Sequence, residues 1–308
     1  MSQSNEGDGR QTPIIRAQPR SFFKAPLCTD LEQLDAEGAF IGVPFDQGTF
    51  GRPGARFGPD GIRDAPRAYS YSDPFGRETE AEGYFDIDAG DELLRGVTMA
   101  DCGNVTILPS EVLDNFNRLT QVVEKVVERG AFPVVVGGDH AITFPAVREF
   151  SKYQPLNIVH FDAHLDYSHD YQGVLHTHGS PIRHCRELPF VGHISSIGIR
   201  TARRAPYEDS QKDGSLIVTT KLFRELGPQA VVDLVPKAEN LYITFDIDGM
   251  DPVHAPGTGT PEVGGLHYQE LRDCVVALVE RGNLVGFDMV EVAPPYDSSE
   301  VPCKWRPD

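Results

Sequence analysis

From about Phe132 onward, short apolar runs alternate with longer amphipathic stretches. Each apolar run has the four to eight residues of a typical strand and is bounded by turn residues. The runs open the segments PVVVGGDH, LNIVHFDAHLD, HISSIGIR, SLIVTT, NLYITFDIDGMD and LVGFDMVEVAPPYD. Strands that are apolar on both faces and alternate with helices are typical of a parallel sheet with helices on both sides. The pattern therefore predicts an α/β fold with a single sheet.

Amphipathic helices are predicted between these strands and before them. The clearest runs from about Pro109 to Arg129, where apolar residues recur at helical spacing. These residues are Val112, Phe116, Leu119, Val122, Val123 and Val126. Further helices are expected over 144–152, through 223–226 and over 268–281, a strand near 39–46 and a short element over 97–105. The acidic stretch 69–91 is expected to be a loop region.

The ends of the chain differ in character from its middle. The first residues, MSQSNEGDGRQTPIIR, are polar and lack the apolar core of a signal peptide. No apolar run approaches the roughly 20 residues that span a bilayer. We expect residues 1–35 to form a flexible tail and residues 36–308 to form a single α/β domain. The last residues contain Pro302 and Pro307, which exclude an ordinary helix there.

Composition narrows the class of partner. The 308 residues include 28 basic and 46 acidic side chains, a formal net charge of −18 with histidine neutral. This balance argues against binding to nucleic acid, which needs a basic surface, and against docking on an anionic membrane. Five cysteines are scattered without a C-x-x-C pair, which favours free thiols in a reducing compartment. We therefore expect a cytoplasmic protein with small or cationic partners.

Acidic and histidine residues follow several predicted strands at the point where each strand ends. They are Asp139, His140, Asp162, His164, Asp166, Asp246, Asp248 and Glu291. Because ligands bind beyond the carboxyl ends of strands in open parallel sheets, we expect these side chains to gather at one edge. A lone Asp-x-Asp is more often a turn or a helix cap. Burying four aspartates together without a cation would cost several kcal/mol each, however, which favours a metal site.

The donor types indicate which metal would bind. Many carboxylate oxygens with a few imidazole nitrogens suit Mn²⁺ or a similar first-row ion. The six side chains His140, Asp162, His164, Asp166, Asp246 and Asp248 are too many for one ion unless carboxylates bridge two. A two-metal centre with shared aspartates is the simplest interpretation, and such a centre produces hydroxide from water near neutral pH.

Three of these segments carry a resemblance to a known family. GGDH at 137–140, DAHLD at 162–166 and DIDGMDP at 246–252 resemble the signature motifs of the ureohydrolase (arginase/agmatinase) family. GRPGARFGPDGIR at 51–63, PGTGTPEVGGL at 256–266 and VEVAPPYD at 290–297 resemble its agmatinase-type branch. The resemblance implies a three-layer α/β/α fold with a mostly parallel sheet. It also implies an enzyme that uses two metal ions to hydrolyse a guanidino compound to urea and an amine.

The resemblance also implies roles for individual residues. His140, Asp162, Asp166 and Asp246 would bind one divalent ion, and Asp162, His164, Asp246 and Asp248 the second, with Mn²⁺ expected and Ni²⁺ as the alternative. Asp166 would also orient the attacking hydroxide, and Glu291 would pair with the substrate guanidinium. His178, in the run THGSP, would protonate the leaving amine. Solvent-exposed loop positions are expected for the neighbouring His176 and His184.

The identity of the substrate depends on local charge. The stretch 167–180, which is expected to line the mouth of the site, contains Asp170 and no Lys or Arg. This favours a cationic tail, as in agmatine, which would be converted to putrescine and urea. The alternatives are guanidinobutyrate, guanidinopropionate, guanidine or an alkylguanidine. The glycine-rich segment 48–59 matches neither the P-loop nor the dinucleotide pattern, so no nucleotide is expected.

Two rival interpretations keep the fold and change the function. Deacetylases share the architecture with one zinc ion, but the presence of both His140 and Asp248 argues against a single-metal site. Agmatinase-type chains usually end in an alanine- and leucine-rich helix, and this chain ends instead in DSSEVPCKWRPD. We expect a homo-oligomer (trimer or hexamer) or a hetero-oligomer whose second subunit covers the apolar patch left bare. A non-catalytic subunit of a mixed oligomer is the remaining alternative.

Overall fold

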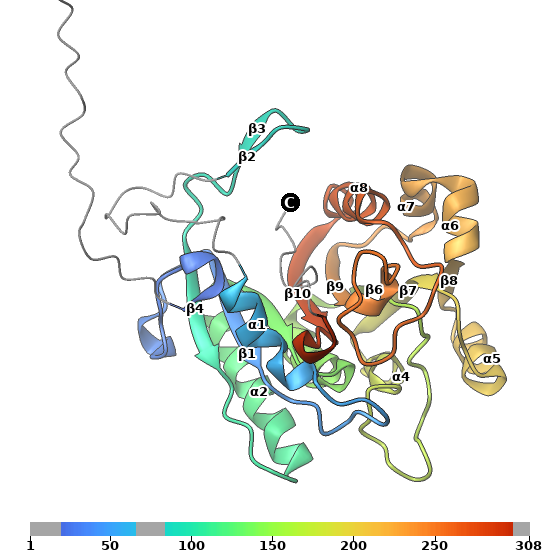
Figure 1. Cartoon of the computed structure of the whole chain (residues 1–308), viewed down its shortest axis with the longest axis horizontal. Coiled ribbons are helices and arrows are strands. Elements are labelled where there is room, and N and C mark those ends of the chain that lie inside the picture. Colours follow the sequence, from blue (N-terminus) through green and yellow to red (C-terminus); the bar gives the residue numbers. More distant parts are fainter. Residues whose placement is uncertain (1–19, 66–83, 298–308) are drawn as a thin grey trace, which may run out of the picture.

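A single eight-stranded sheet forms the centre of the protein (Figure 1). The structure is a computed structural model and describes residues 20–65 and 84–297. The strand order is β4-β1-β5-β10-β9-β6-β7-β8, and all neighbouring strands are parallel. The strands are β1 Gly38–Val43, β4 Met99–Asn104, β5 Phe132–Gly137, β6 Leu156–Phe161, β7 Val191–Ile199, β8 Leu216–Thr219, β9 Asn240–Asp246 and β10 Asn283–Val290. The predicted parallel sheet is confirmed.

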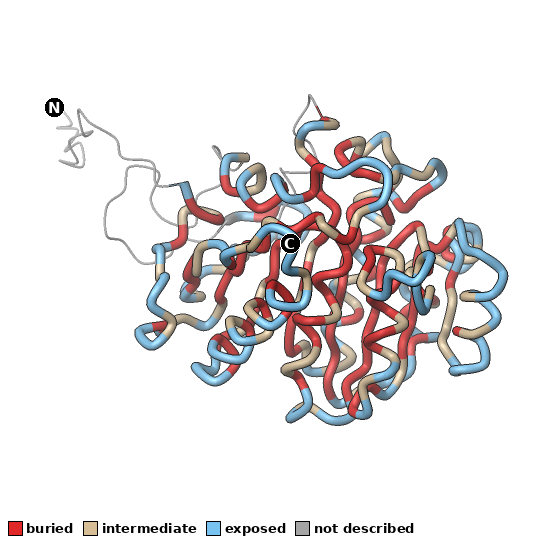
Figure 2. The backbone as a smooth tube through the Cα atoms, turned by 90° about the horizontal axis from the view of Figure 1, so that it is seen from below, coloured by how far each residue is buried: buried red, intermediate tan, exposed pale blue. Residues whose placement is uncertain are grey.

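Helices cover both faces of this sheet and give the three predicted α/β/α layers. The α-helices are α1 Gly58–Asp64, α2 Val112–Glu128, α3 Thr143–Val147, α4 Pro181–Arg186, α5 Arg204–Lys212, α6 Thr220–Leu226, α7 Pro228–Leu234 and α8 Tyr268–Val279. One hydrophobic core lies between the sheet and α2, α3 and α4. A second core lies between the sheet and α6, α7 and α8. Figure 2 shows the buried central strands between exposed outer segments.

The central strands are buried along their whole length. Every residue of β6 and of β9 is buried, which matches their nearly continuous apolar sequence. Between them and β5 lies β10, so the carboxyl ends of β5, β10, β9 and β6 are adjacent at one edge. This order is what places the segments that follow these strands next to one another in space.

The predicted helix over 144–152 is divided into α3 and a 3₁₀ segment, Arg148–Tyr153. Phe150 leaves helical geometry with φ −91° and ψ 17°. Its fully buried ring packs edge-on against Tyr242, with 5.2 Å between the ring centroids. Burial of this aromatic side chain outweighs the helical periodicity of the segment.

Part of the acidic stretch 69–91 forms a hairpin instead of the predicted loop. Its strands are β2 Tyr84–Asp86 and β3 Asp91–Leu93. Asp86 Oδ1 accepts hydrogen bonds from the N–H groups of Asp88 (2.7 Å) and Ala89 (2.8 Å), which stabilise the turn. Residues 66–83, which include the rest of that stretch, lie outside the described residues.

Residues 20–35, which the sequence assigns to the flexible tail, pack against the domain. Phe22 is fully buried, and its ring lies 5.3 Å from the ring of Phe40 on β1. Its backbone N–H donates to Asp101 Oδ2 at 3.0 Å. This part of the tail prediction is wrong because the segment buries apolar side chains against strands distant in sequence. For residues 1–19, which lie outside the described residues, the flexible tail stays a prediction.

An apolar cavity of about 590 Å³ adjoins α8 on one face of the sheet. Its lining includes Phe40, Val134, Val136, Leu271, Phe287 and Met289. The expected lack of a final helix concerns residues 298–308, which lie outside the described residues. Among the described residues, none of the helices is long and apolar enough to cross a membrane.

Candidate metal centre and adjoining pocket

The edge of the sheet formed by β5, β10, β9 and β6 gathers the predicted metal ligands. His140 opens a 3₁₀ turn (His140–Ile142) directly after β5, and Asp248 lies in another (Ile247–Gly249) directly after β9. Asp162, His164 and Asp166 follow β6. Four of the six candidate ligands are less than 4% exposed, namely His140, Asp162, Asp246 and Asp248. Carboxylates and imidazoles are therefore held close together away from water.

His140 is surrounded by three carboxylates. Its Nδ1 atom lies 3.1 Å from Asp162 Oδ2, 3.0 Å from Asp166 Oδ2 and 3.2 Å from Asp246 Oδ2. None of these contacts has hydrogen-bond geometry, so Nδ1 is a buried polar atom without a hydrogen-bond partner among the described residues. Four donor atoms that converge without bonding to one another fit a single cation between them.

A second group of donors lies beside the first. His164 Nδ1 is 3.1 Å from Asp248 Oδ2 and 3.5 Å from Asp162 Oδ1. Asp162 thus contributes one oxygen to each group, as a bridging carboxylate would. Asp246 lies in the first group and accepts a hydrogen bond from the N–H of Asp248 (2.9 Å) through its other oxygen. The family resemblance implied that Asp246 would bind both ions. In the structure Asp246 belongs to the first group of donor atoms and not to the second.

The orientation of the His140 ring is set by buried residues that the sequence interpretation missed. His140 Nε2 lies 3.1 Å from Thr244 Oγ1, and the Thr244 hydroxyl donates to Asp288 Oδ1 at 2.7 Å. Because that hydroxyl is already a donor to Asp288, the ring donates from Nε2 and keeps the Nδ1 lone pair for the carboxylate side. Tyr242 also donates to Asp288, at 2.8 Å.

His160 is a further buried histidine that the sequence interpretation did not single out. Its Nε2 lies 2.8 Å from Asp162 Oδ2, and its Nδ1 lies 3.1 Å from Ser196 Oγ. His160 precedes Asp162 by two residues, so both face the same side of an extended chain. That spacing was the signal available in the sequence.

Asp139 connects the glycine-rich loop to the turn that carries His140. It accepts hydrogen bonds from the N–H of Gly48 (2.7 Å), the hydroxyl of Thr49 (3.2 Å) and the N–H of Ala141 (3.1 Å). Burial and the charge of Glu291 raise the pKa of Asp139 to about 7. Gly48 and Thr49 belong to the glycine-rich loop, and Ala141 lies in the 3₁₀ turn that begins at His140. Asp139 therefore holds these two segments together and helps to position the site.

His178 and Glu291 form a pair on the other side of the cluster. His178 Nδ1 lies 3.1 Å from Glu291 Oε1, which also accepts the backbone N–H of His140 at 3.0 Å. Burial alone would lower the pKa of His178, but the hydrogen bond to Glu291 and the nearby acidic charges raise it to about 9. The imidazole is therefore protonated at neutral pH.

The two other histidines of that loop are directed elsewhere. His184 Nε2 lies 2.9 Å from the carbonyl oxygen of Leu175, and the His176 ring lies 5.2 Å from that of Phe116. Neither lines the pocket beside the acidic cluster, whereas His178 does. Both are more buried than expected: His184 is 8% exposed, and burial lowers the pKa of His176.

Asp166 and Glu291 both adopt backbone conformations that are uncommon for residues other than glycine. Their φ angles are 47° and 62°. Such left-handed conformations cost of order 1–3 kcal/mol and occur most often at functional sites. The strain at these two positions aims one carboxylate at His140 and the other at His178.

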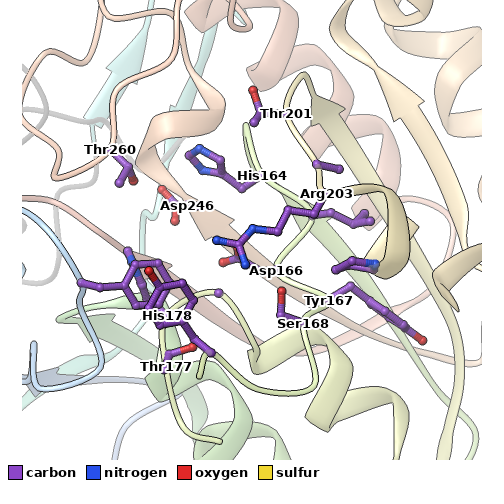
Figure 3. A pocket seen from close by; sticks show the side chains of 16 residues that line it. His164, Asp166, Tyr167, Ser168, Thr177, His178, Thr201, Arg203, Asp246 and Thr260 are labelled. Carbon is purple, nitrogen blue, oxygen red and sulfur yellow. The ribbon is translucent and has the colours of Figure 1, made fainter. Parts of the chain in front are cut away.

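A pocket of about 200 Å³ opens onto the cluster (Figure 3). Its lining includes His164, Asp166, His178 and Asp246 from the cluster, together with Phe50, Tyr171, Thr201 and Arg203. Asp170, which the sequence placed at the mouth, is absent from the lining. Asp170 instead accepts the N–H of Gly173 at 2.8 Å within its own loop.

Gly138 is predicted to be essential for the turn that carries His140. A Cβ atom at this position would lie 1.8 Å from the carbonyl oxygen of Phe45, so the backbone would have to move. We expect Gly138→Ala to lower the free energy of unfolding by about 1–3 kcal/mol or more, measured by chemical denaturation. Gly38→Ala is the control, because its Cβ would meet only Met99 Cγ at 3.6 Å. Equal stabilities of the two variants would contradict the prediction.

Comparison with known proteins identifies the family. Residues 36–302 match the model of the arginase family. The chain is 36% identical over 290 residues to the mitochondrial agmatinase of Gallus gallus, covering 91% of this chain and 80% of that protein. It is 34% identical over 290 residues to the mitochondrial guanidino acid hydrolase of Homo sapiens, covering 91% and 77%.

A solved structure supports the same assignment. Proclavaminate amidino hydrolase from Streptomyces clavuligerus has a TM-score of 0.81 and 31% identity, with 94% of this chain and 93% of that chain covered. The chain belongs to the arginase family. It is a hydrolase that acts on carbon–nitrogen bonds of linear amidines.

Proposed function

We propose that this chain hydrolyses a guanidino compound to urea and an amine, as an agmatinase-like ureohydrolase. The observation that carries the proposal is the set of three carboxylates around the unpaired Nδ1 of His140, beside a pocket that also contains His178. Relatives named for agmatine and for guanidino acids support the substrate class. Agmatine is the substrate expected from the sequence, and guanidinobutyrate, guanidinopropionate, guanidine and alkylguanidines are the alternatives.

Two divalent ions would be held by the buried donors, Mn²⁺ in the first instance and Ni²⁺ as the alternative. The first ion would be bound by His140, Asp162, Asp166 and Asp246, and the second by Asp162, His164, Asp246 and Asp248. The mixed oxygen and nitrogen donors support this choice of metal. Bound ions of this kind supply a Lewis acid and lower the pKa of bound water to about 7.

Glu291 and Asp166 would orient the reactants. A guanidinium is planar and permanently charged, and a carboxylate can accept two of its N–H groups side by side. Glu291 is buried, its carboxylate is held by His178 and by the N–H of His140, and it is thereby pre-oriented for a cation. Asp166, at the floor of the pocket, would accept a hydrogen bond from the attacking water.

His178 would give its proton to the departing amine nitrogen. It lines the pocket and lies opposite the carboxylate cluster, next to Glu291. The raised pKa keeps the proton on the ring until the carbon–nitrogen bond breaks.

His178→Ala is expected to lower kcat about 10²- to 10⁴-fold while the metal content stays unchanged. The loss follows from removing a general acid that contributes no metal ligand. Urea release and inductively coupled plasma mass spectrometry measure the two quantities. His169→Ala is the matched control, since His169 lies on the same loop, is exposed and does not line the pocket. Loss of metal in His178→Ala would contradict the assigned role.

A urea-release screen tests the proposed function itself. The chain, reloaded with Mn²⁺ or Ni²⁺, is incubated with agmatine, arginine, 4-guanidinobutyrate, 3-guanidinopropionate, guanidine and alkylguanidines. Urea from at least one guanidine supports the proposal. One tightly bound zinc ion per chain would favour the deacetylase-like alternative. Absence of urea with every substrate and metal would favour a non-catalytic subunit.

We further propose a homo-oligomer, a trimer or hexamer, with a hetero-oligomer as the alternative. The apolar cavity beside α8 supports association, because buried contacts would remove its surface from water. Light scattering coupled to size-exclusion chromatography measures the mass, and a monomer would contradict this proposal.

A cytoplasmic location is also proposed. The free thiols Cys28, Cys102, Cys185 and Cys274 support a reducing compartment, and cell fractionation tests it.

A further inference from the structure

Arg203 lies at the rim of the pocket, outside every motif that the family resemblance covers. It follows β7 and is the N-cap residue of α5. Its side chain is exposed and lines the pocket. Figure 3 shows this side chain extending across the pocket, with its guanidinium group in front of Asp166. A permanent positive charge thus stands at the entrance to a site with an acidic floor.

This arginine is not used to hold the fold together. Within residues 20–65 and 84–297, no carboxylate lies within 4.0 Å of Arg203, and its one ring contact is with Tyr171, 5.3 Å from Cζ to the centroid. Arg200, three residues earlier, differs in this respect. Its guanidinium donates to the carbonyl oxygens of Gly198 (3.0 Å), Asp248 (2.7 Å) and Glu262 (2.9 Å). Arg203 therefore keeps its N–H donors available for a ligand.

The surroundings of Arg203 add positive potential to the rim. The first turn of α5 contains no acidic residue, and its N-cap makes no side-chain hydrogen bond. Uncapped N–H groups at a helix N-terminus favour an anion nearby. Asp170 does not offset this charge in the pocket, because its oxygens bind Gly173 N–H and His169 within their own loop.

An aromatic wall joins the two ends of the pocket. The ring of Phe50 meets the His178 ring edge-on at 4.3 Å and stacks on the Tyr171 ring at 4.3 Å. The Tyr171 ring in turn lies under the Arg203 guanidinium. The pocket therefore has a group that can bind an acid at one end, an apolar wall, and a floor that can bind a cation. This arrangement is complementary to a short methylene chain with opposite charges at its ends.

We propose that the substrate is an ω-guanidino acid, whose carboxylate is bound by Arg203 while its guanidinium lies at the acidic floor. This inference rests on the proposed function and names the substrate class for the same site. An arginine fork matches a carboxylate through two parallel N–H···O bonds. The ammonium tail of agmatine would instead meet a like charge at the same place, which selects against it.

The test compares 4-guanidinobutyrate with agmatine, two substrates of similar length whose tails carry opposite charges. The Mn²⁺-loaded wild type is expected to show at least about tenfold higher kcat/KM with the acid. Arg203→Gln is expected to raise KM for the acid roughly 10- to 100-fold with a smaller change in kcat, because a charge-assisted pair is lost. Arg203→Glu is expected to raise kcat/KM for agmatine and so invert the preference.

Arg204→Gln is the matched control. Arg204 is the next residue, is 89% exposed and does not line the pocket, so its loss should leave both substrates unaffected. A wild type that prefers agmatine, or an Arg203→Gln variant with KM for the acid within twofold of wild type, would overturn the inference alone. No urea from any guanidine would overturn the proposed function and the inference together.

Discussion

Asp246→Ala is expected to abolish both metal binding and urea release. Asp246 Oδ2 lies 3.2 Å from His140 Nδ1, and Asp246 Oδ1 holds the turn that carries Asp248. The substitution therefore removes a proposed ligand of both ions and loosens a second one. Without bound metal the pKa of the attacking water would be far above neutral, so urea release should fall more than about 10⁴-fold.

Metal content by mass spectrometry and a colorimetric urea assay measure the two losses in the same preparation. Asp233→Ala is the control, because the Asp233 carboxylate is 61% exposed on α7, pairs with Arg281 and does not line the pocket. We expect it to keep both metal and activity. Full activity in Asp246→Ala would refute the two-metal assignment.

Asp101→Leu is expected to lower the free energy of unfolding by about 3–5 kcal/mol, because the buried Arg63 guanidinium then lacks its buried carboxylate partner. Arg63 donates from Nε to Asp101 Oδ2 at 2.8 Å and from Nη2 to Asp101 Oδ1 at 2.9 Å. Both side chains are buried, at 6% and 0% exposure. Asp101 also accepts the backbone N–H groups of Phe22 and Gly103, so one carboxylate connects α1, β4 and the N-terminal segment.

Urea denaturation measures this change, with an exposed ion pair as the control. Arg95 and Glu92 are 71% and 41% exposed, so Glu92→Gln should change the free energy of unfolding by no more than about 1 kcal/mol. A loss below 1 kcal/mol in Asp101→Leu would contradict the burial argument. Replacing Arg63 and Asp101 together by apolar residues should cost less than Asp101→Leu, because neither of the two buried charges then remains without the other.

The sheet and the candidate ligands were predictable because their signals are local. The strands β6 and β9 are buried throughout, and their sequences are nearly continuously apolar. An acidic residue at the end of such a strand stands out, as Asp162 does directly after β6 and Asp246 does as the last residue of β9. The topological rule for parallel sheets then places both at the same edge, and the structure does so.

The residues around those ligands were not predictable in the same way. Thr244 and His160 are single polar residues within apolar strands, where the pattern is typical of core packing. Asp288 is significant only because β10 lies beside β9 and brings it to the Thr244 hydroxyl. Such pairings are decided by strand order, which the hydrophobic pattern does not contain.

Long-range packing also explains the corrected elements. Phe22 is far from Phe40 in the chain, yet burial of the two rings orders a segment that composition assigns to a tail. Phe150 bends a predicted helix for the same reason, since its ring is buried against Tyr242. In both places the free energy of aromatic burial exceeds the local preference.

The amino-acid sequence alone was thus enough to predict the fold class, the edge of the sheet that carries the site and the candidate ligands, because each depends on a few neighbouring residues. The charge that would contact the substrate tail could be identified only from the tertiary structure. Asp170 lies in the expected stretch but turns into its own loop, whereas Arg203, from beyond β7, reaches the pocket. A binding pocket is assembled from segments brought together by packing, so its polarity is a property of the tertiary structure.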